Sequence, residues 1–330
     1  MSDTSVLRAA IKKIATGPTQ SKDLSRAEAR EAMALILAGQ ADPVQAGIFL
    51  VALRMKRETD DENFGILEAL KTATVQVPVA VPDLLEMADP YDGLARYLPG
   101  SPFLPALLAA CGLPTIIHGC RQMGPKYGLT PHAVLSAAGQ PTDLRVEQAA
   151  ARLADPACGW AYLDQALMAP GLHALVGLRD LMVKRSCLST MEKMLMPLRA
   201  RQGTHLLIGF VHKDYESLLA RLAAAGGYDS ALIVRGTEGG VLPVLKGRTV
   251  VRRWSASVPD SAWETQASEL GMDYPERGVP RPGALAYGQT DDESPALPPA
   301  AAAQESADLG QAALRDTPGP MRDWLIYGAS

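Results

Sequence analysis

The first 75 residues of the chain place apolar and polar side chains with the period of α-helices. Between residues 25 and 39 the apolar positions recur every three or four residues, which is typical of one buried helical face. Ser25 followed by Glu28 has the spacing of a capping box, which satisfies free backbone N–H groups at a helix start. Asp42 followed by Pro43 marks the start of a second helix. The pattern predicts a helical N-terminal region.

After Pro78 the pattern changes to short β-branched runs that alternate with segments rich in alanine and leucine. Such alternation predicts an α/β fold with a mostly parallel central sheet. The predicted strands are residues 113–119, 204–212, 230–236 and 249–254. The predicted helices between them are residues 103–112, 145–155 and 214–227.

A second helical stretch, residues 170–185 and 191–199, interrupts this alternation. The simplest arrangement returns it to the first helices, which gives two discontinuous lobes. We therefore expect a helical lobe of residues 1–76 and 167–198, and an α/β lobe of residues 77–166 and 199–330 that includes the C-terminal tail. In that tail, residues 286–303 have the composition of a linker, residues 305–316 have a helical pattern, and Pro320 is placed to begin a last helix.

The composition is that of a globular protein. With 330 residues, of which 47% are hydrophobic and 21% charged, the chain can form one large or two modest cores. The N-terminus lacks the features of a signal peptide and no apolar run approaches about 20 residues, so we expect a cytoplasmic protein without a membrane partner. The four cysteines form no CxxC pair, which signals neither a zinc site nor a disulfide framework.

The net charge of −4 is unevenly distributed. The chain from Ala256 onward has four basic and twelve acidic residues, whereas residues 167–255 have thirteen basic and six acidic residues, a balance of +7. A local excess of this size can attract polyanions. The same residues can equally be an ordinary solvated surface, so charge alone does not decide between these interpretations.

Residues 116–128 run from a short β-branched patch into a loop that has the composition of a phosphate cradle. Glycines at 119, 124 and 128 would let backbone N–H groups approach an anion, and Arg121 and Lys126 would supply positive charge. The loop has no serine or threonine, however, and hydroxyl groups usually complete the binding of a phosphate or its magnesium.

Several segments resemble anthranilate phosphoribosyltransferase in order and spacing. Residues 24–69 resemble its N-terminal helices, and "AACGLPTIIHGCR" resembles its strand and K-H-G-N-R loop. "SALIVRGTEGG", "PERGVPRP" and "GPMRD" resemble later segments. The resemblance implies a fold of the nucleoside phosphorylase and phosphoribosyltransferase type, an active site in a cleft between two lobes, and a homodimer formed through the helical lobes.

The segments that hold pyrophosphate in this family are altered. Where the enzymes have G-T-G-G-D and N-x-S-T, residues 88–102 read "ADPYDGLARYLPGSP", in which Asp92, Gly93 and Ser101 can match. The prolines that intrude have no N–H donor. In the basic loop His118, Gly119, Arg121 and Lys126 match the family. These seven residues are the candidate residual anion-binding cleft, which phosphate or sulfate could occupy; for His118 and Arg121 a purely structural role is the alternative.

The magnesium site that the resemblance implies is also altered. Its acidic pair falls on Val241 and Leu242, with only Glu238 kept nearby. Magnesium needs oxygen ligands, which aliphatic side chains do not supply. We therefore expect no catalytic residue, no metal and no cofactor, and no transfer of a phosphoribosyl group to anthranilate.

This set of losses is similar to that of the YbiB-like paralogues, a branch that lacks the transferase motifs and binds nucleic acid. The similarity extends to "RGTEGG" and "STMEKMLMP". The candidate nucleic-acid-binding residues are Lys184, Arg185, Lys193, Arg199 and Arg201, with Lys12, Lys13, Lys56 and Arg57 as secondary candidates. No signature of a sequence-reading motif is present.

Three functions remain open on the sequence. The first is a non-catalytic, sequence-independent nucleic-acid-binding dimer, for which the sequence does not distinguish DNA from RNA. The second is a phosphoribosyl or other glycosyl transferase with an altered acceptor and metal site. The third is a metabolite-binding protein.

Overall fold

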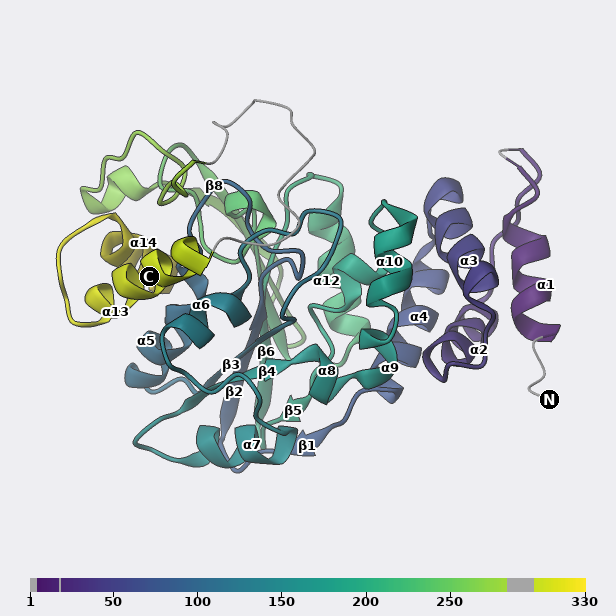
Figure 1. Cartoon of the computed structure of the whole chain (residues 1–330), viewed down its shortest axis with the longest axis horizontal. Coiled ribbons are helices and arrows are strands. Elements are labelled where there is room, and N and C mark those ends of the chain that lie inside the picture. Colours follow the sequence, from purple (N-terminus) through teal and green to yellow (C-terminus); the bar gives the residue numbers. More distant parts are fainter. Residues whose placement is uncertain (1–4, 18, 284–299) are drawn as a thin grey trace.

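The N-terminal region of the computed structural model, which describes residues 5–17, 19–283 and 300–330, is helical as predicted (Figure 1). Its helices are α1 (Ser5–Ile14), α2 (Arg26–Leu37), α3 (Pro43–Lys56) and α4 (Asp60–Thr72). The capping box of Ser25 and Glu28 is present at α2, and Asp42 caps α3 by accepting from the N–H groups of Val44 and Gln45. The local sequence therefore sets where these helices start.

A seven-stranded sheet of order β4-β3-β2-β6-β7-β8-β9 forms the centre of the molecule. Its strands are β2 (Asp83–Ala88), β3 (Thr115–Gly119), β4 (Trp160–Asp164), β6 (Gly203–Gly209), β7 (Ser230–Val234), β8 (Thr249–Ser255) and β9 (Ser261–Thr265). The first five strands in the sheet order are parallel, β8 pairs antiparallel with β7, and β9 pairs antiparallel with β8. This arrangement confirms the predicted mostly parallel α/β fold. A separate parallel pair joins β1 (Val77–Pro78) to β5 (Leu198–Arg199).

Helices cover both faces of the sheet (Figure 1). They are α5 (Leu104–Ala110), α6 (Pro131–Ala137), α7 (Val146–Ala154), α12 (Tyr215–Ala225), α13 (Ala300–Leu314) and α14 (Pro320–Ala329), with short 3-10 helices η1 (Ser101–Phe103), η2 (Thr237–Gly239) and η3 (Ala267–Leu270). One apolar core lies under α5, α6, α13 and α14 on one face. The other core is continuous from the N-terminal helices to the opposite face, so the helices and the sheet are packed together without a break.

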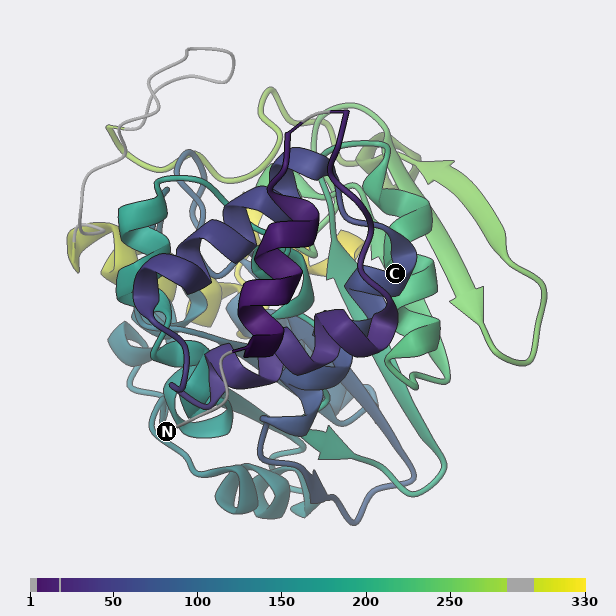
Figure 2. The same ribbon diagram turned by 90° about the vertical axis from the view of Figure 1, so that its right-hand side faces the viewer.

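The second helical stretch returns to the N-terminal helices. It consists of α8 (Gln165–Met168), α9 (Pro170–His173), α10 (Val176–Met182) and α11 (Leu188–Met191). Helix α10 packs against α3, and Figure 2 shows this end of the molecule with α1 in front. The predicted helix of residues 191–199 is wrong: only Met191 is helical, and the chain then runs to β5 past Met196, whose φ of 51° breaks a helix.

The C-terminal predictions are partly confirmed. Pro320 begins α14 as expected. Helix α13 starts at Ala300, so the last four residues of the predicted linker, 286–303, are helical. These four residues are alanines, which form the first turn of α13. The remainder of that linker lies outside the described residues. Within the described residues, no helix combines the length and apolar character required to span a membrane.

Candidate functional site

The segments that follow the carboxyl ends of the parallel strands lie at one edge of the sheet, and those after β2 and β3 carry five of the seven predicted anion-site residues. Two of these segments cross closely: Leu94 pairs with Leu129 in an isolated bridge. Gly93, with a φ of 75°, lies at this crossing, and a Cβ atom added there would lie 2.4 Å from the carbonyl carbon of Gly128. Both positions thus require glycine for backbone packing.

Glu238 lies at this edge in a pocket of backbone donors. Its carboxylate accepts hydrogen bonds from the N–H groups of Ala95 (3.0 Å), Arg96 (2.8 Å) and Tyr97 (3.3 Å), and forms an ion pair with Lys126 at 2.8 Å. Burial raises the pKa of Glu238, but Lys126 and the backbone donors outweigh burial and hold the pKa below its ordinary value. Three amides and one lysine around an anion are the arrangement of an anion-binding site, and the chain fills it with its own carboxylate.

Asp89 is a second buried carboxylate at this edge. Its Oδ1 atom accepts from the N–H of Val241 at 3.0 Å, and its Oδ2 atom accepts from the hydroxyl of Ser101. Burial raises the pKa of Asp89. Ser101, predicted to bind an anion, instead donates to this internal carboxylate. The sequence analysis missed Asp89, although it directly follows β2.

Lys193 is buried, with 7% of its surface exposed, and its ammonium donates to the carbonyl of Gly209 at 2.7 Å. Burial lowers its pKa to about 8. The prediction that Lys193 belongs to a surface for nucleic acid is therefore wrong, because this side chain is inside the protein. Its positive charge acts on the buried Asp89 instead.

One further ion pair connects this edge to the returning stretch, and a second lies within that stretch. The Nε atom of Arg185 donates to Asp92 at 2.7 Å; Asp92 is buried, whereas 47% of the Arg185 side chain is exposed. The guanidinium of Arg179 donates to Glu192 with one contact at 2.9 Å, and both side chains are buried. The charge of Asp92, a predicted anion-site residue, is thus already compensated. Asp89, Asp92 and Lys193 are buried, and the side chains of Lys126 and Glu238 are 15% and 5% exposed. We name these five residues the buried charge cluster.

His118 is fully buried in the sheet and does not reach the surface. Its Nε2 atom lies 2.9 Å from a carboxylate oxygen of Glu86, and its Nδ1 atom is hydrogen-bonded to the hydroxyl of Tyr91. Gly119 is the last residue of β3, and Arg121 is exposed just after it. Of the seven predicted anion-site residues, only Arg121 is exposed and outside these internal contacts and backbone crossings.

A second group of cations is exposed. The residues Arg54, Arg57, Lys184 and Lys213, which we name the basic rim, lie at the end of α3, after α10 and after β6. Arg54 donates to the carbonyl of Arg185, which joins two of these segments. Tyr215 is 38% exposed and lies within electrostatic reach of Arg54 and Arg185, so it connects the start of α12 to the same surface.

The remaining predicted basic residues do not join this surface. Arg199 is in β5, and the N–H of Arg201 donates to the carbonyl of Val81, which places both at the opposite edge of the sheet, where the parallel strands begin. Lys56 is buried in an ion pair of 2.9 Å with Glu62, and Lys13 pairs with Glu28 at 2.8 Å. The five primary candidates therefore occupy three places. The contributions of Arg54, Lys213 and Tyr215 were missed; only the position of Lys213 just after a predicted strand could have signalled one of them.

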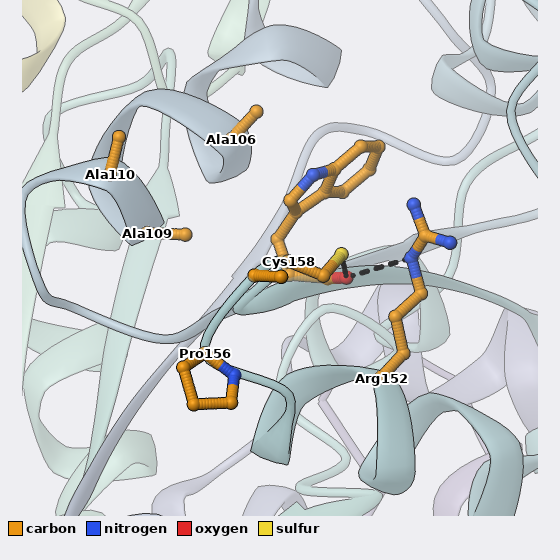
Figure 3. Close-up of a pocket in the computed structure, with 8 residues that line it drawn as sticks. Ala106, Ala109, Ala110, Arg152, Pro156 and Cys158 are labelled. Carbon is orange, nitrogen blue, oxygen red and sulfur yellow. Dashed lines mark hydrogen bonds between the residues drawn. The ribbon is translucent and has the colours of Figure 1, made fainter.

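A cavity of about 450 Å³ lies far from this edge, between α5, α7 and the outer strand β4 (Figure 3). Arg152 donates to the carbonyl of Trp160 at 3.2 Å and lies 5.3 Å from the centre of its ring. The thiol of Cys158 donates to the same carbonyl at 3.3 Å. The polar side chains of this cavity thus close a turn, and three alanines form its opposite wall.

Metal ligands do not gather at either place. No group of three or more His, Cys, Asp or Glu side chains that could hold a metal ion occurs in the part of the chain that the structure describes. At the positions of the implied acidic pair, Val241 and Leu242 are buried in the apolar core.

Comparison with known proteins agrees with this architecture. The helical bundle domain of the glycosyl transferase family matches residues 8–73. Anthranilate phosphoribosyltransferase of Bradyrhizobium diazoefficiens is 27% identical over 98% of this chain and 87% of its own length, and the uncharacterized protein YbiB of Escherichia coli is 29% identical over 71% of this chain and 72% of its own. The structure of the Saccharomyces cerevisiae anthranilate phosphoribosyltransferase in complex with PRPP and Mg superposes with a TM-score of 0.74 at 17% identity, covering 99% of this chain and 87% of that chain.

Proposed function

We propose that this chain, which is anthranilate phosphoribosyltransferase-like in its sequence and its fold, is a non-catalytic protein that binds nucleic acid without sequence preference. The observation that carries the proposal is the position of Glu238. A carboxylate held by three amides and Lys126 excludes a second anion from the same donors. External phosphates are then left to the exposed cations of the basic rim.

The chemistry of phosphoribosyl transfer supports the non-catalytic part. The departing pyrophosphate must be neutralised and oriented, so catalysis depends on cations and donors aimed at it. Here Lys126 is paired, and Lys193 is buried against a carbonyl. The aliphatic Val241 and Leu242 belong to the core and give no ligand for magnesium.

The basic rim supports the binding part. Its four cations are exposed, and Arg54 donates to the carbonyl of Arg185, the residue that follows Lys184. Contacts of such cations with phosphates carry no base information. Tyr215, beside them, offers a ring on which a base could stack. Glu58 and Asp214 lie on the same segments, so we expect weak binding.

We also propose that the chain is a homodimer that associates through α3 and α10. Four apolar side chains follow one face of α3, at intervals of three or four residues: Val44, Ile48, Val51 and Met55, the last 76% exposed. Leu181 of the neighbouring α10 is 82% exposed. A contiguous exposed apolar surface of this kind is typical of an interface, and a two-fold axis would also place two basic rims on one particle.

A mobility-shift experiment tests the main proposal. The protein is titrated at low salt against single- and double-stranded DNA and RNA of unrelated sequences. Retardation of at least one of these nucleic acids, with similar affinity for different sequences, is the expected result. No retardation of any of the four would contradict it.

A transferase with an altered site is the second candidate function, and the similarity over 98% of the chain to an enzyme of that name favours it. Calorimetric titration with phosphoribosyl pyrophosphate and magnesium, together with an assay of anthranilate turnover, separates the two. We expect neither tight magnesium-dependent binding nor turnover. Micromolar binding that requires magnesium would favour the transferase.

A further inference from the structure

The backbone conformation of Glu238 lets its carboxylate reach the loop of residues 95–97. Its backbone has a φ of 51°, which is uncommon for a residue other than glycine, asparagine or aspartate. Two glycines, at positions 239 and 240, follow it, and Gly239 has a φ of 82°. This turn aims one carboxylate at the backbone of residues 95–97, which are distant in sequence.

The donors around this carboxylate match an oxyanion. Three consecutive N–H groups, of Ala95, Arg96 and Tyr97, converge on its two oxygens, and the Lys126 ammonium completes the set. Consecutive backbone N–H groups that converge in this way bind phosphate and similar anions in many proteins. The donors are fixed by the chain, so they need no rearrangement to meet another anion.

Apart from the Glu238 carboxylate, the charged side chains discussed at this site, Lys126 and Arg281, are positive. The side chain of Arg281 is buried, burial lowers its pKa, and Glu238 is the negative charge that opposes this shift. Arg281 also donates to the carbonyl of Ala95 at 3.4 Å. Removal of the Glu238 charge would leave Lys126 and Arg281 buried without it, which is costly unless another anion enters.

We propose that the N–H groups of residues 95–97 and Lys126 form a binding site for a tetrahedral oxyanion such as phosphate, and that Glu238 is its built-in occupant. In the wild-type chain the site is closed at neutral pH, because the carboxylate stays ionised. The inference does not depend on nucleic-acid binding, which involves other side chains.

The test uses the variant Glu238→Ala, which empties the site, and inorganic phosphate as the probe. Thermal unfolding is recorded for the full chain with and without about 10 mM phosphate, with chloride at equal ionic strength as the salt control. We expect phosphate to raise the unfolding midpoint of Glu238→Ala by several degrees and to leave the wild type within about one degree. The matched control is Glu264→Ala, which removes an exposed carboxylate paired with Arg248 and should behave as the wild type.

A second pair of variants identifies the donors. Glu238→Gln keeps the shape of the side chain and removes its charge, so it serves if alanine prevents folding; phosphate should stabilise it as well. Adding Lys126→Met to either variant should abolish the effect of phosphate. Equal midpoint shifts in the wild type, Glu264→Ala and the Glu238 variants would show general salt binding and overturn the proposal. So would the absence of a shift in both Glu238 variants.

Discussion

The buried charge cluster and the basic rim both contain lysines, yet the two groups differ in what compensates the charge of those lysines. In the cluster, Glu238 pairs with Lys126, Asp92 pairs with Arg185, and Lys193 donates to a carbonyl. In the rim, Lys184 and Lys213 extend into solvent. A buried charge must be compensated within the protein because burial without a partner is costly, whereas an exposed charge is compensated by water and by any anion that arrives.

Because of this difference, a count of basic residues in the sequence does not give the number that can contact an external phosphate. Lys193 and Lys184 are nine positions apart and look equivalent in a count of charge, but only Lys184 can meet a phosphate from outside. The balance of +7 in residues 167–255 therefore includes the charge of Lys193, which an external phosphate cannot reach.

The largest expected effect is the loss of a buried pair. Replacing Arg179 with methionine leaves Glu192 buried without its counter-charge, and we expect the free energy of unfolding to fall by about 3–5 kcal/mol. Urea unfolding measures the change. The matched variant Arg248→Met removes an exposed pair with Glu264 and should change stability little. A similar small change for both variants would contradict the distinction between buried and exposed charge.

The proposed dimer gives the next prediction. Met55→Glu places a charge on the exposed apolar face of α3, and we expect it to convert the dimer into a monomer of about 35 kDa, seen by light scattering. The side chain is already exposed in one chain, so folding should be retained. Leu270→Glu, at an exposed apolar position of η3, is the control and should remain a dimer. A monomeric wild type would refute the proposal directly.

Lys193 gives a pH-dependent prediction. Its pKa is lowered from 10.5 to about 8 in the folded protein, so between these values the unfolded chain binds more protons and stability rises with pH. Measured relative to Lys193→Met, the free energy of unfolding of the wild type should increase by about 2 kcal/mol between about pH 7.5 and pH 10. Urea unfolding at the two pH values gives this difference. If the difference in free energy of unfolding between the wild type and Lys193→Met did not change with pH, the pKa of Lys193 would not be lowered by burial.

The smallest expected effect concerns the rim. Replacing Arg57 and Lys184 together with alanine should weaken binding of all sequences alike and reduce the salt dependence by about two units per subunit. The control is the double variant of Arg199 and Arg201, which lie at the opposite edge of the sheet and should leave the salt dependence unchanged. Arg185 is unsuitable as a target, because its removal would also leave Asp92 without a partner.

Local patterns in the sequence were enough to predict the helical N-terminus and the parallel sheet. The capping boxes and the β-branched runs act within a few residues, which is why α2, β3, β6 and β7 were predicted. Strand β2 was missed because its buried Glu86 interrupts the apolar run. The Oε1 atom of Glu86 is paired with His118, 32 positions later.

The charged contacts could not be predicted in the same way. Glu238 meets amides about 140 positions earlier, and Asp92 meets Arg185 from another element. No periodic pattern in a single sequence records such pairs. The sequence correctly singled out Glu238 and Lys126, but it gave no sign that the two are partners of each other.

The salt dependence of binding to a short duplex DNA, followed by fluorescence anisotropy, tests the central claim most directly. If the four cations of the basic rim meet phosphates while the buried charge cluster meets none, the slope of log affinity against log salt should be about −3 to −4 per subunit. It should be the same for unrelated sequences. No binding at about 50 mM salt, or binding that does not change with salt, would contradict the account.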